Sequence, residues 1–148
     1  MNLKKLFVSI LIPLGLGTLV GLVTSGNTDY IQPSFAPPAI LFPIVWSILY
    51  TLMGISSYII SESNSYKKDK ALTIYWIQLI FNLLWSFVFF VFNLKTFAFI
   101  WILALILLVI IMIKRFLEIN KTAGYLQIPY LLWLVFASIL NLSIVFLN

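Results

Sequence analysis

Charged side chains are scarce in this 148-residue chain, and their positions divide it into long apolar segments. It has nine lysines and arginines and four acidic residues, and all except Asp29 and Lys95 fall on alternate connections between uncharged runs. About 20 residues cross the hydrocarbon core as a helix, and a central charge costs on the order of 2.5–3.5 kcal/mol. The sequence therefore predicts membrane-spanning helices at about residues 6–24, 38–61, 71–92, 96–116 and 123–147.

The composition indicates the same fold class. Hydrophobic residues make up 63% of the chain and the mean hydropathy is +1.12, which leaves too little polar material to cover a water-facing surface. The first run follows "MNLKK" like a secretory signal, but no small-residue cleavage site comes after it, so we expect a retained helix. Residues 1–148 are predicted to form one domain, an all-α membrane protein with a five-transmembrane-helix bundle.

The distribution of lysine and arginine predicts the orientation. Lys4 and Lys5, the second connection and the fourth connection are basic, whereas the opposite side carries only Lys95. Because basic short loops stay on the cytoplasmic side, we expect a cytoplasmic N-terminus and an outside C-terminus, in a bacterial plasma (inner) membrane. The net charge of +5 then reflects topology and attraction to membrane lipid, and no nucleic-acid partner is expected.

Missing residue types exclude several kinds of chemistry. The chain has no cysteine and no histidine, which removes thiol nucleophiles, imidazole bases and the usual zinc and haem ligands. Its four acids all lie in predicted connections, so no buried carboxylate can relay protons, and no phosphate-binding loop is present. We expect no metal site, no required cofactor and no hydrolytic active site.

Polar and aromatic side chains recur at helical spacing inside three of the runs, so each set shares one helix face. An unpaired amide in hydrocarbon costs several kcal/mol, so these faces should point into the bundle. Two interpretations stay open, namely hydrogen bonds between helices or the wall of a binding cavity. The sets are Trp46 with Tyr50; Gln78, Asn82 and Trp85; and Trp133, Ala137 and Asn141.

Prolines mark the first connection, at about residues 25–37, and the fifth helix. Pro37 and Pro38 cannot lie inside a helix, and we expect one of them to open the second helix at its first position. With Tyr30 before them, this connection is either a folded lid on the outer side or a stiff corner anchored at the interface. Pro129 is expected to bend the fifth helix and aim Trp133 inward.

Three segments together resemble the TspO/MBR family, also called translocator or tryptophan-rich sensory proteins. They are "PSFAPPAILFPIVWSILYTLMG", "QLIFNLLWSFVFF" and "PYLLWLVFASILNLSIVFLN", in the family's order and over nearly the whole chain. The resemblance implies a five-helix membrane protein that binds porphyrins, with sterols and benzodiazepine-type ligands known for some members.

The resemblance also implies roles for particular residues. Trp46 and Trp133 match the two tryptophans that line the family's ligand pocket, and they would carry the light- and oxygen-dependent porphyrin breakdown reported for the family. Gln78 would be a polar neighbour of the pocket, and the segment from Tyr30 through Pro37 and Pro38 would close it. Four further residues match pocket-wall positions: Tyr50, Asn82, Trp85 and Ala137.

Some positions depart from the family pattern. Phe35 stands where a tryptophan is usual, Gln32 where a lysine is common, and Trp101 where many members have an aspartate. Without the loop lysine, recognition of porphyrin propionates is expected to be weaker. The last helix lacks the tyrosine and basic residue of the proposed cholesterol pattern, so sterol binding is not predicted.

We therefore expect a membrane receptor for porphyrin-type tetrapyrroles and related apolar ligands. A facilitative transporter of tetrapyrroles or other amphipathic molecules is the alternative, and a scaffold without a ligand is a third interpretation. Five helices from one chain do not divide into inverted halves, which disfavours driven transport. Gly17 and Gly21 form a G-x-x-x-G step suited to close packing, within the chain or in a homodimer.

Overall fold

The computed structural model describes residues 1–26 and 29–148, and in this part of the chain all regular structure is helical. These described residues include five helical segments long and apolar enough to span a membrane, which confirms the predicted fold class. The elements are α1 (Leu3–Thr24), α2 (Leu41–Ser61), α3 (Lys68–Ser86) continued by a π-helical turn η1 (Phe87–Val91), α4 (Lys95–Ile119), α5 (Lys121–Tyr125) and α6 (Ile128–Leu147).

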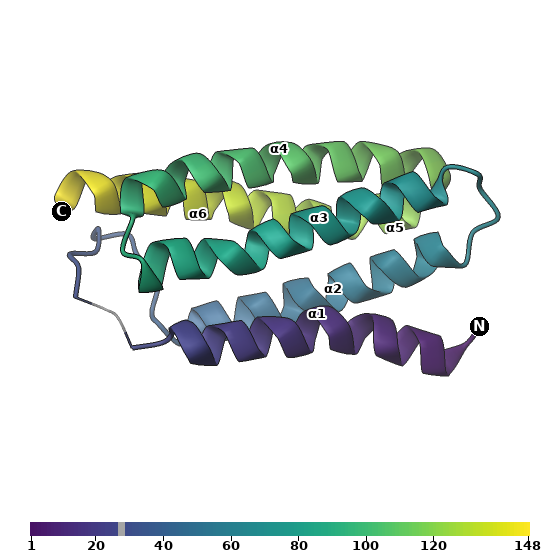
Figure 1. Ribbon diagram of the computed structural model, residues 1–148, viewed down its shortest axis with the longest axis horizontal. Helices are drawn as coiled ribbons and strands as arrows, with labels where there is room; N and C mark the ends of the chain where they lie inside the picture. The colour runs from purple at the N-terminus through teal and green to yellow at the C-terminus, as the bar shows by residue number, and fades with distance from the viewer. Residues whose placement is uncertain (27–28) are drawn as a thin grey trace.

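The spans form an elongated bundle in which α1 packs mainly along α2, while α4 packs against α3 and α6 (Figure 1). The N-terminus, the α2–α3 connection and α5 lie at one end, and the α1–α2 connection and the C-terminus lie at the other (Figure 1). Neither α1 nor α2 has extensive contacts with α6. Both α1 and α2 pack instead against α3, and α2 also packs against α5.

Several helices run further than the uncharged segments. Lys68 begins α3, and Lys114 and Arg115 lie inside the last turns of α4 rather than in the connection that follows. Long basic side chains can extend from a helix end into the headgroup region while the backbone continues its hydrogen bonding. The length of an uncharged run therefore corresponds to the part of the helix inside the hydrocarbon core, and the helix itself is longer.

The adjacent prolines do not open α2 as predicted. The helix begins at Leu41, after both of them, and Pro38 lies in a turn in which its carbonyl accepts a hydrogen bond from the Leu41 amide at 3.0 Å. The residue before a proline is disfavoured in the helical region, so Pro37 cannot start the helix. The carbonyl of Pro38 instead starts a hydrogen-bonded turn that leads into α2.

Where a bend at Pro129 was expected within one helix, the structure has a break between two helices. Helix α5 ends at Tyr125, α6 begins at Ile128, and Pro129 lies in the first turn of α6. A proline is favoured there because the amide hydrogen that it lacks would have no partner within the helix. The buried Gln127 precedes α6, and its carbonyl accepts a hydrogen bond from the Leu131 amide at 3.2 Å.

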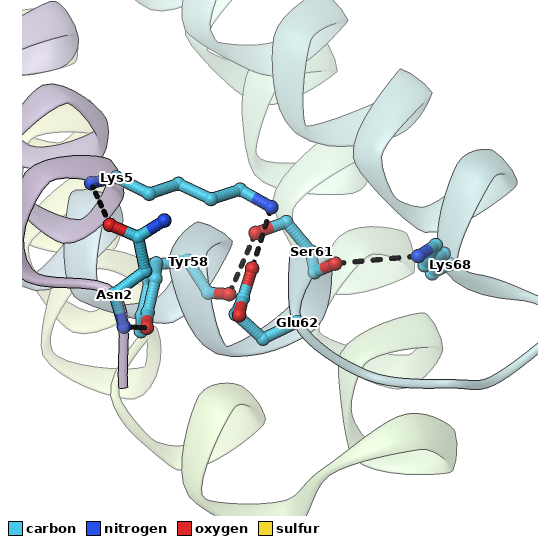
Figure 2. Close-up of polar contacts among 6 residues, drawn as sticks. All are labelled: Asn2, Lys5, Tyr58, Ser61, Glu62 and Lys68. Carbon is cyan, nitrogen blue, oxygen red and sulfur yellow. Dashed lines mark hydrogen bonds and ion pairs between the residues drawn. The ribbon is translucent and has the colours of Figure 1, made fainter.

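Polar contacts hold the end of the bundle that contains the N-terminus. The Asn2 amide donates to the Tyr58 hydroxyl at 2.8 Å, and Lys5 Nζ lies 2.6 Å from Glu62 Oε1 (Figure 2). The hydrogen bond from Lys5 holds the pKa of the Glu62 carboxyl below its ordinary value, so this carboxylate is charged at neutral pH. Both contacts tie the start of α1 to the end of α2.

Candidate functional site

A cavity of about 690 Å³ lies in the half of the bundle nearest the α1–α2 connection. Its volume falls within the roughly 300–1,000 Å³ range of small-molecule sites. The wall includes Leu14, Gly17, Thr18, Val20, Gly21, Leu22 and Thr24 of α1; Phe42, Pro43, Trp46, Ser47 and Tyr50 of α2; Asn82, Trp85, Ser86, Phe89 and Phe90 of α3 and η1; Ile102 and Leu105 of α4; and Trp133, Leu134, Ala137, Leu140, Asn141 and Ile144 of α6.

The α1–α2 connection supplies the remaining wall residues, among them Ser25, Gly26, Tyr30, Gln32, Pro37 and Ala39. The predicted lid, residues 25–37, includes residues 27 and 28, which lie outside the described part of the chain. Pro38 is exposed and is not part of the wall. The described remainder of this connection, which we call the lid, therefore closes one end of the cavity.

Aromatic rings from α2 form one side of the cavity. The Trp46 indole stacks on the Tyr50 ring, with centroids 5.3 Å apart and an interplanar angle of 30°. The same indole and the Tyr130 ring make a T-shaped contact with centroids 6.2 Å apart. These contacts fix the orientation of the Trp46 indole before a ligand binds. Less side-chain entropy is then lost when a flat molecule stacks on it.

Indole rings from α6 and α3 complete the aromatic wall. Trp133 packs against Phe42 of α2 in an edge-to-face contact with centroids 5.8 Å apart. Trp85 stacks on Phe89 at 4.9 Å, and its Nε1 lies 3.2 Å from the Ala98 carbonyl oxygen. Tryptophans predicted on three separate helices therefore face the same cavity.

A chain of hydrogen bonds crosses the bundle beside this wall. The Tyr50 hydroxyl donates to Asn82 Oδ1 at 2.6 Å, Asn82 Nδ2 donates to the Tyr130 hydroxyl at 2.9 Å, and that hydroxyl donates to Gln78 Oε1 at 2.7 Å. Asn82 and Tyr50 also line the cavity, whereas Gln78 is fully buried outside the wall. The two interpretations of these amides thus both apply: Asn82 bridges helices and lines the cavity, and Gln78 bridges only.

Eight of the ten side chains predicted to bind a ligand therefore line the cavity, the exceptions being Pro38 and Gln78. Helical spacing left open whether Gln78 bridges helices or lines a cavity, and the family resemblance implied a polar neighbour of the pocket. Gln78 lies one turn before Asn82 on α3, is fully buried and bonds to Tyr130. The role of the eight in binding, and of Trp46 and Trp133 in porphyrin photo-oxidation, stays a prediction.

Residues of α1 form part of the wall, and the sequence analysis assigned none of them to a binding site. Thr18 and Thr24 line the cavity, but their hydroxyls donate to the carbonyls of Leu14 and Val20 in their own helix, each at 2.7 Å. The helix is apolar on all sides, so periodicity gives no indication of which face points inward. Gly17 and Gly21 were interpreted as a close-packing step; both line the cavity, and Gly17 also packs against the Tyr50 ring.

Asn141 had been placed on the same stripe as Trp133 and Ala137 without a predicted binding role. Its Nδ2 donates to the Lys95 carbonyl oxygen at 3.0 Å, and its Oδ1 accepts from Trp85 Nε1 at 3.3 Å. Asn141 is also part of the cavity wall. It therefore fixes the Trp85 indole and links α6 to the start of α4.

The lid is attached to the end of α6. The Ile31 amide donates to Asn148 Oδ1 at 2.8 Å, and Asn148 Nδ2 donates to the Ile31 carbonyl at 2.9 Å. The Tyr30 ring contacts Phe89 edge to face at 5.6 Å, and burial raises the pKa of its phenol above the ordinary value. Tyr30 is therefore a neutral wall residue. The lid is held by the Asn148 side-chain amide, by the contact of Tyr30 with Phe89, and by an edge-to-face contact of Phe35 with Phe136 of α6 at 6.5 Å.

The fold and the site define a class of protein, a helical membrane protein with a mainly apolar cavity of ligand size whose wall includes three tryptophans. Residues 9–147 match the TspO/MBR family. The chain is 37% identical to the tryptophan-rich protein TspO of Archaeoglobus fulgidus, over 100% of this chain and 99% of that protein. It is 31% identical to the translocator protein of Ovis aries, over 74% of this chain and 67% of the relative.

A tryptophan-rich protein TspO of Chlorobaculum tepidum is 35% identical, over 82% of this chain and 78% of its own length. The chain belongs to the TspO/MBR family of integral membrane proteins.

Proposed function

We propose that this protein is a membrane receptor that binds porphyrin-type tetrapyrroles, and related flat apolar ligands, in the cavity between α1, α2, α3 and α6. The observation that carries the proposal is the convergence of Trp46, Trp85 and Trp133, from three helices, on one cavity of about 690 Å³. Indole rings stack on a flat aromatic ligand, and the Asn82 and Asn141 amides in the same wall can orient its polar edge.

Titration with protoporphyrin IX tests this function. We expect quenching of tryptophan fluorescence that saturates at one porphyrin per chain, with a dissociation constant on the order of 1 µM, equivalent to about 8 kcal/mol of binding free energy. An induced circular dichroism band at the porphyrin absorption maximum should follow the same curve, because the wall fixes the ligand in a chiral site. Quenching that rises without saturation, and without the dichroism band, would show partition into detergent alone.

We also propose that the protein lies in a bacterial plasma membrane with the lid outside and the N-terminus in the cytoplasm. The basic residues of α1, of the α2–α3 connection and of the end of α4 gather at the N-terminal end of the bundle, and Lys95 lies at the other. Basic residues are retained on the cytoplasmic side during insertion, which supports this orientation.

Single cysteines test the orientation, since the chain has none of its own. Ser34 in the lid and Asn64 in the α2–α3 connection are both exposed. In spheroplasts we expect a membrane-impermeant maleimide to label Ser34→Cys and to label Asn64→Cys only after lysis. The reverse pattern would contradict the proposed orientation, and equal labelling of both variants in sealed cells would indicate a mixed topology.

A further inference from the structure

One ammonium group lies close to the cavity, separated from it by two aromatic rings. Lys95, the first residue of α4, donates through Nζ to the Phe89 carbonyl at 3.0 Å and to Asn93 Oδ1 at 2.8 Å. The same Nζ lies 4.5 Å from the centroid of the Tyr30 ring and 4.1 Å from that of Phe89. Because both rings are part of the cavity wall, they form a thin partition between the ammonium and the cavity.

A smaller recess of about 290 Å³ lies on the far side of Tyr30. Lys95, Asn93, Thr96 and Asp29 line it, and Tyr30 belongs to the walls of both the recess and the cavity. The ring of Tyr30 is carried by the lid, whereas Phe89 is fixed in η1 by its stacking on Trp85. A movement of the lid would therefore join the polar recess to the apolar cavity beside the Lys95 ammonium.

Lys95 has no carboxylate partner among the described residues. The ion pairs in this part of the chain are Lys5 with Glu62 and Lys67 with Glu118, both at the other end of the bundle. Asp29 lines the same recess without forming an ion pair with Lys95. The ammonium is held by neutral oxygens and by ring faces, which bind a cation less strongly than a carboxylate does at short range.

We propose that Lys95 is the anchor for a carboxylate on the polar edge of the ligand, with Tyr30 as the ring that moves aside to admit it. This inference rests on the proposed function and narrows it to flat apolar molecules that carry a carboxylate. The ligand's body would occupy the cavity and its carboxylate the recess, where Asn93 and Thr96 supply further polar groups. Asp29 opposes the carboxylate, so the attraction depends on direct contact with Nζ.

A purely structural role for Lys95 makes a different prediction. By donating to the Phe89 carbonyl, Lys95 also caps the C-terminal end of η1, a position where a cation is favourable. Loss of this cap would weaken the binding of every ligand to the same degree. Loss of a carboxylate anchor would weaken only the binding of acids.

The experiment compares protoporphyrin IX with its dimethyl ester, which has the same ring and no carboxylate. We expect the wild type to bind the acid about tenfold more tightly than the ester, a ratio typical of one charge-assisted hydrogen bond. Lys95→Met should remove this preference, because loss of the cap on η1 lowers both affinities by the same factor and only loss of the anchor changes their ratio. Lys95→Arg should retain it, as should the control Lys70→Met at the other end of the bundle.

Asp29→Asn is an independent variant that keeps Lys95 in place, and it should raise the ratio of acid to ester affinity. Equal affinities in the wild type, an unchanged ratio in Asp29→Asn, or an equal loss of both affinities in Lys95→Met would each overturn the inference while the proposed function stands. Failure of both compounds to bind the wild type would instead refute the proposed function.

Discussion

Gly21→Phe should abolish porphyrin binding while the protein keeps its fold. A Cβ atom built on Gly21 would have no heavy atom within 4 Å, and the residue lines the cavity, so a benzyl group can enter this space without displacing a neighbour. It would then occupy the volume that the ligand needs. We expect the affinity to fall by about 100-fold or more, which corresponds to about 2.8 kcal/mol.

Gly15→Phe is the matched control for this variant. Gly15 lies on the same helix and a Cβ there also has no neighbour within 4 Å, but the residue is not part of the cavity wall. The control should bind protoporphyrin IX like the wild type in the fluorescence and dichroism titration. If Gly21→Phe bound equally well with an unchanged thermal transition, the ligand would have to lie outside the cavity.

Gly54→Leu should strongly destabilise the protein by forcing α1 away from α2. A Cβ atom on Gly54 would lie 2.6 Å from the Ser9 carbonyl oxygen and would also clash with Ile10 Cα, so the obstacle is backbone that cannot turn aside. Overpacking of this kind costs about 3 kcal/mol. We expect the melting temperature in detergent to fall by roughly 10 °C.

Gly15→Leu again serves as the control, because it adds the same side chain to α1 without meeting a neighbour. Replacement of glycine by leucine in a helix favours folding by about 1 kcal/mol in helix propensity, so this control should melt at or slightly above the wild-type temperature. An equal melting temperature for Gly54→Leu would mean that α1 and α2 do not cross closely at this glycine.

The five spans could be predicted from the sequence because the energetics that define them are local. A charged side chain at any position between Leu72 and Phe92, for example, would be costly in the hydrocarbon core whatever its neighbours are. The uncharged run by itself therefore identifies a membrane-spanning segment. Helical spacing likewise predicted that Asn82 points inward, since an amide cannot face hydrocarbon alone. The prediction that Trp46 and Trp133 line one cavity was based on the family resemblance, because helical spacing alone does not relate residues on two different helices.

Tertiary structure decided what depends on distances between helices. The register between α3 and α6 makes Gln78 a bridge to Tyr130 outside the cavity, although its spacing matches that of Asn82. Only the packing of α1 on α2 turns Gly21 toward the cavity, and only the lid places Tyr30 over Lys95, which is far from it in sequence. Hydrophobicity and helical periodicity determine which residues face the interior of the bundle and which face lipid. The packing distances between helices determine which of the interior residues surround a cavity large enough for a ligand.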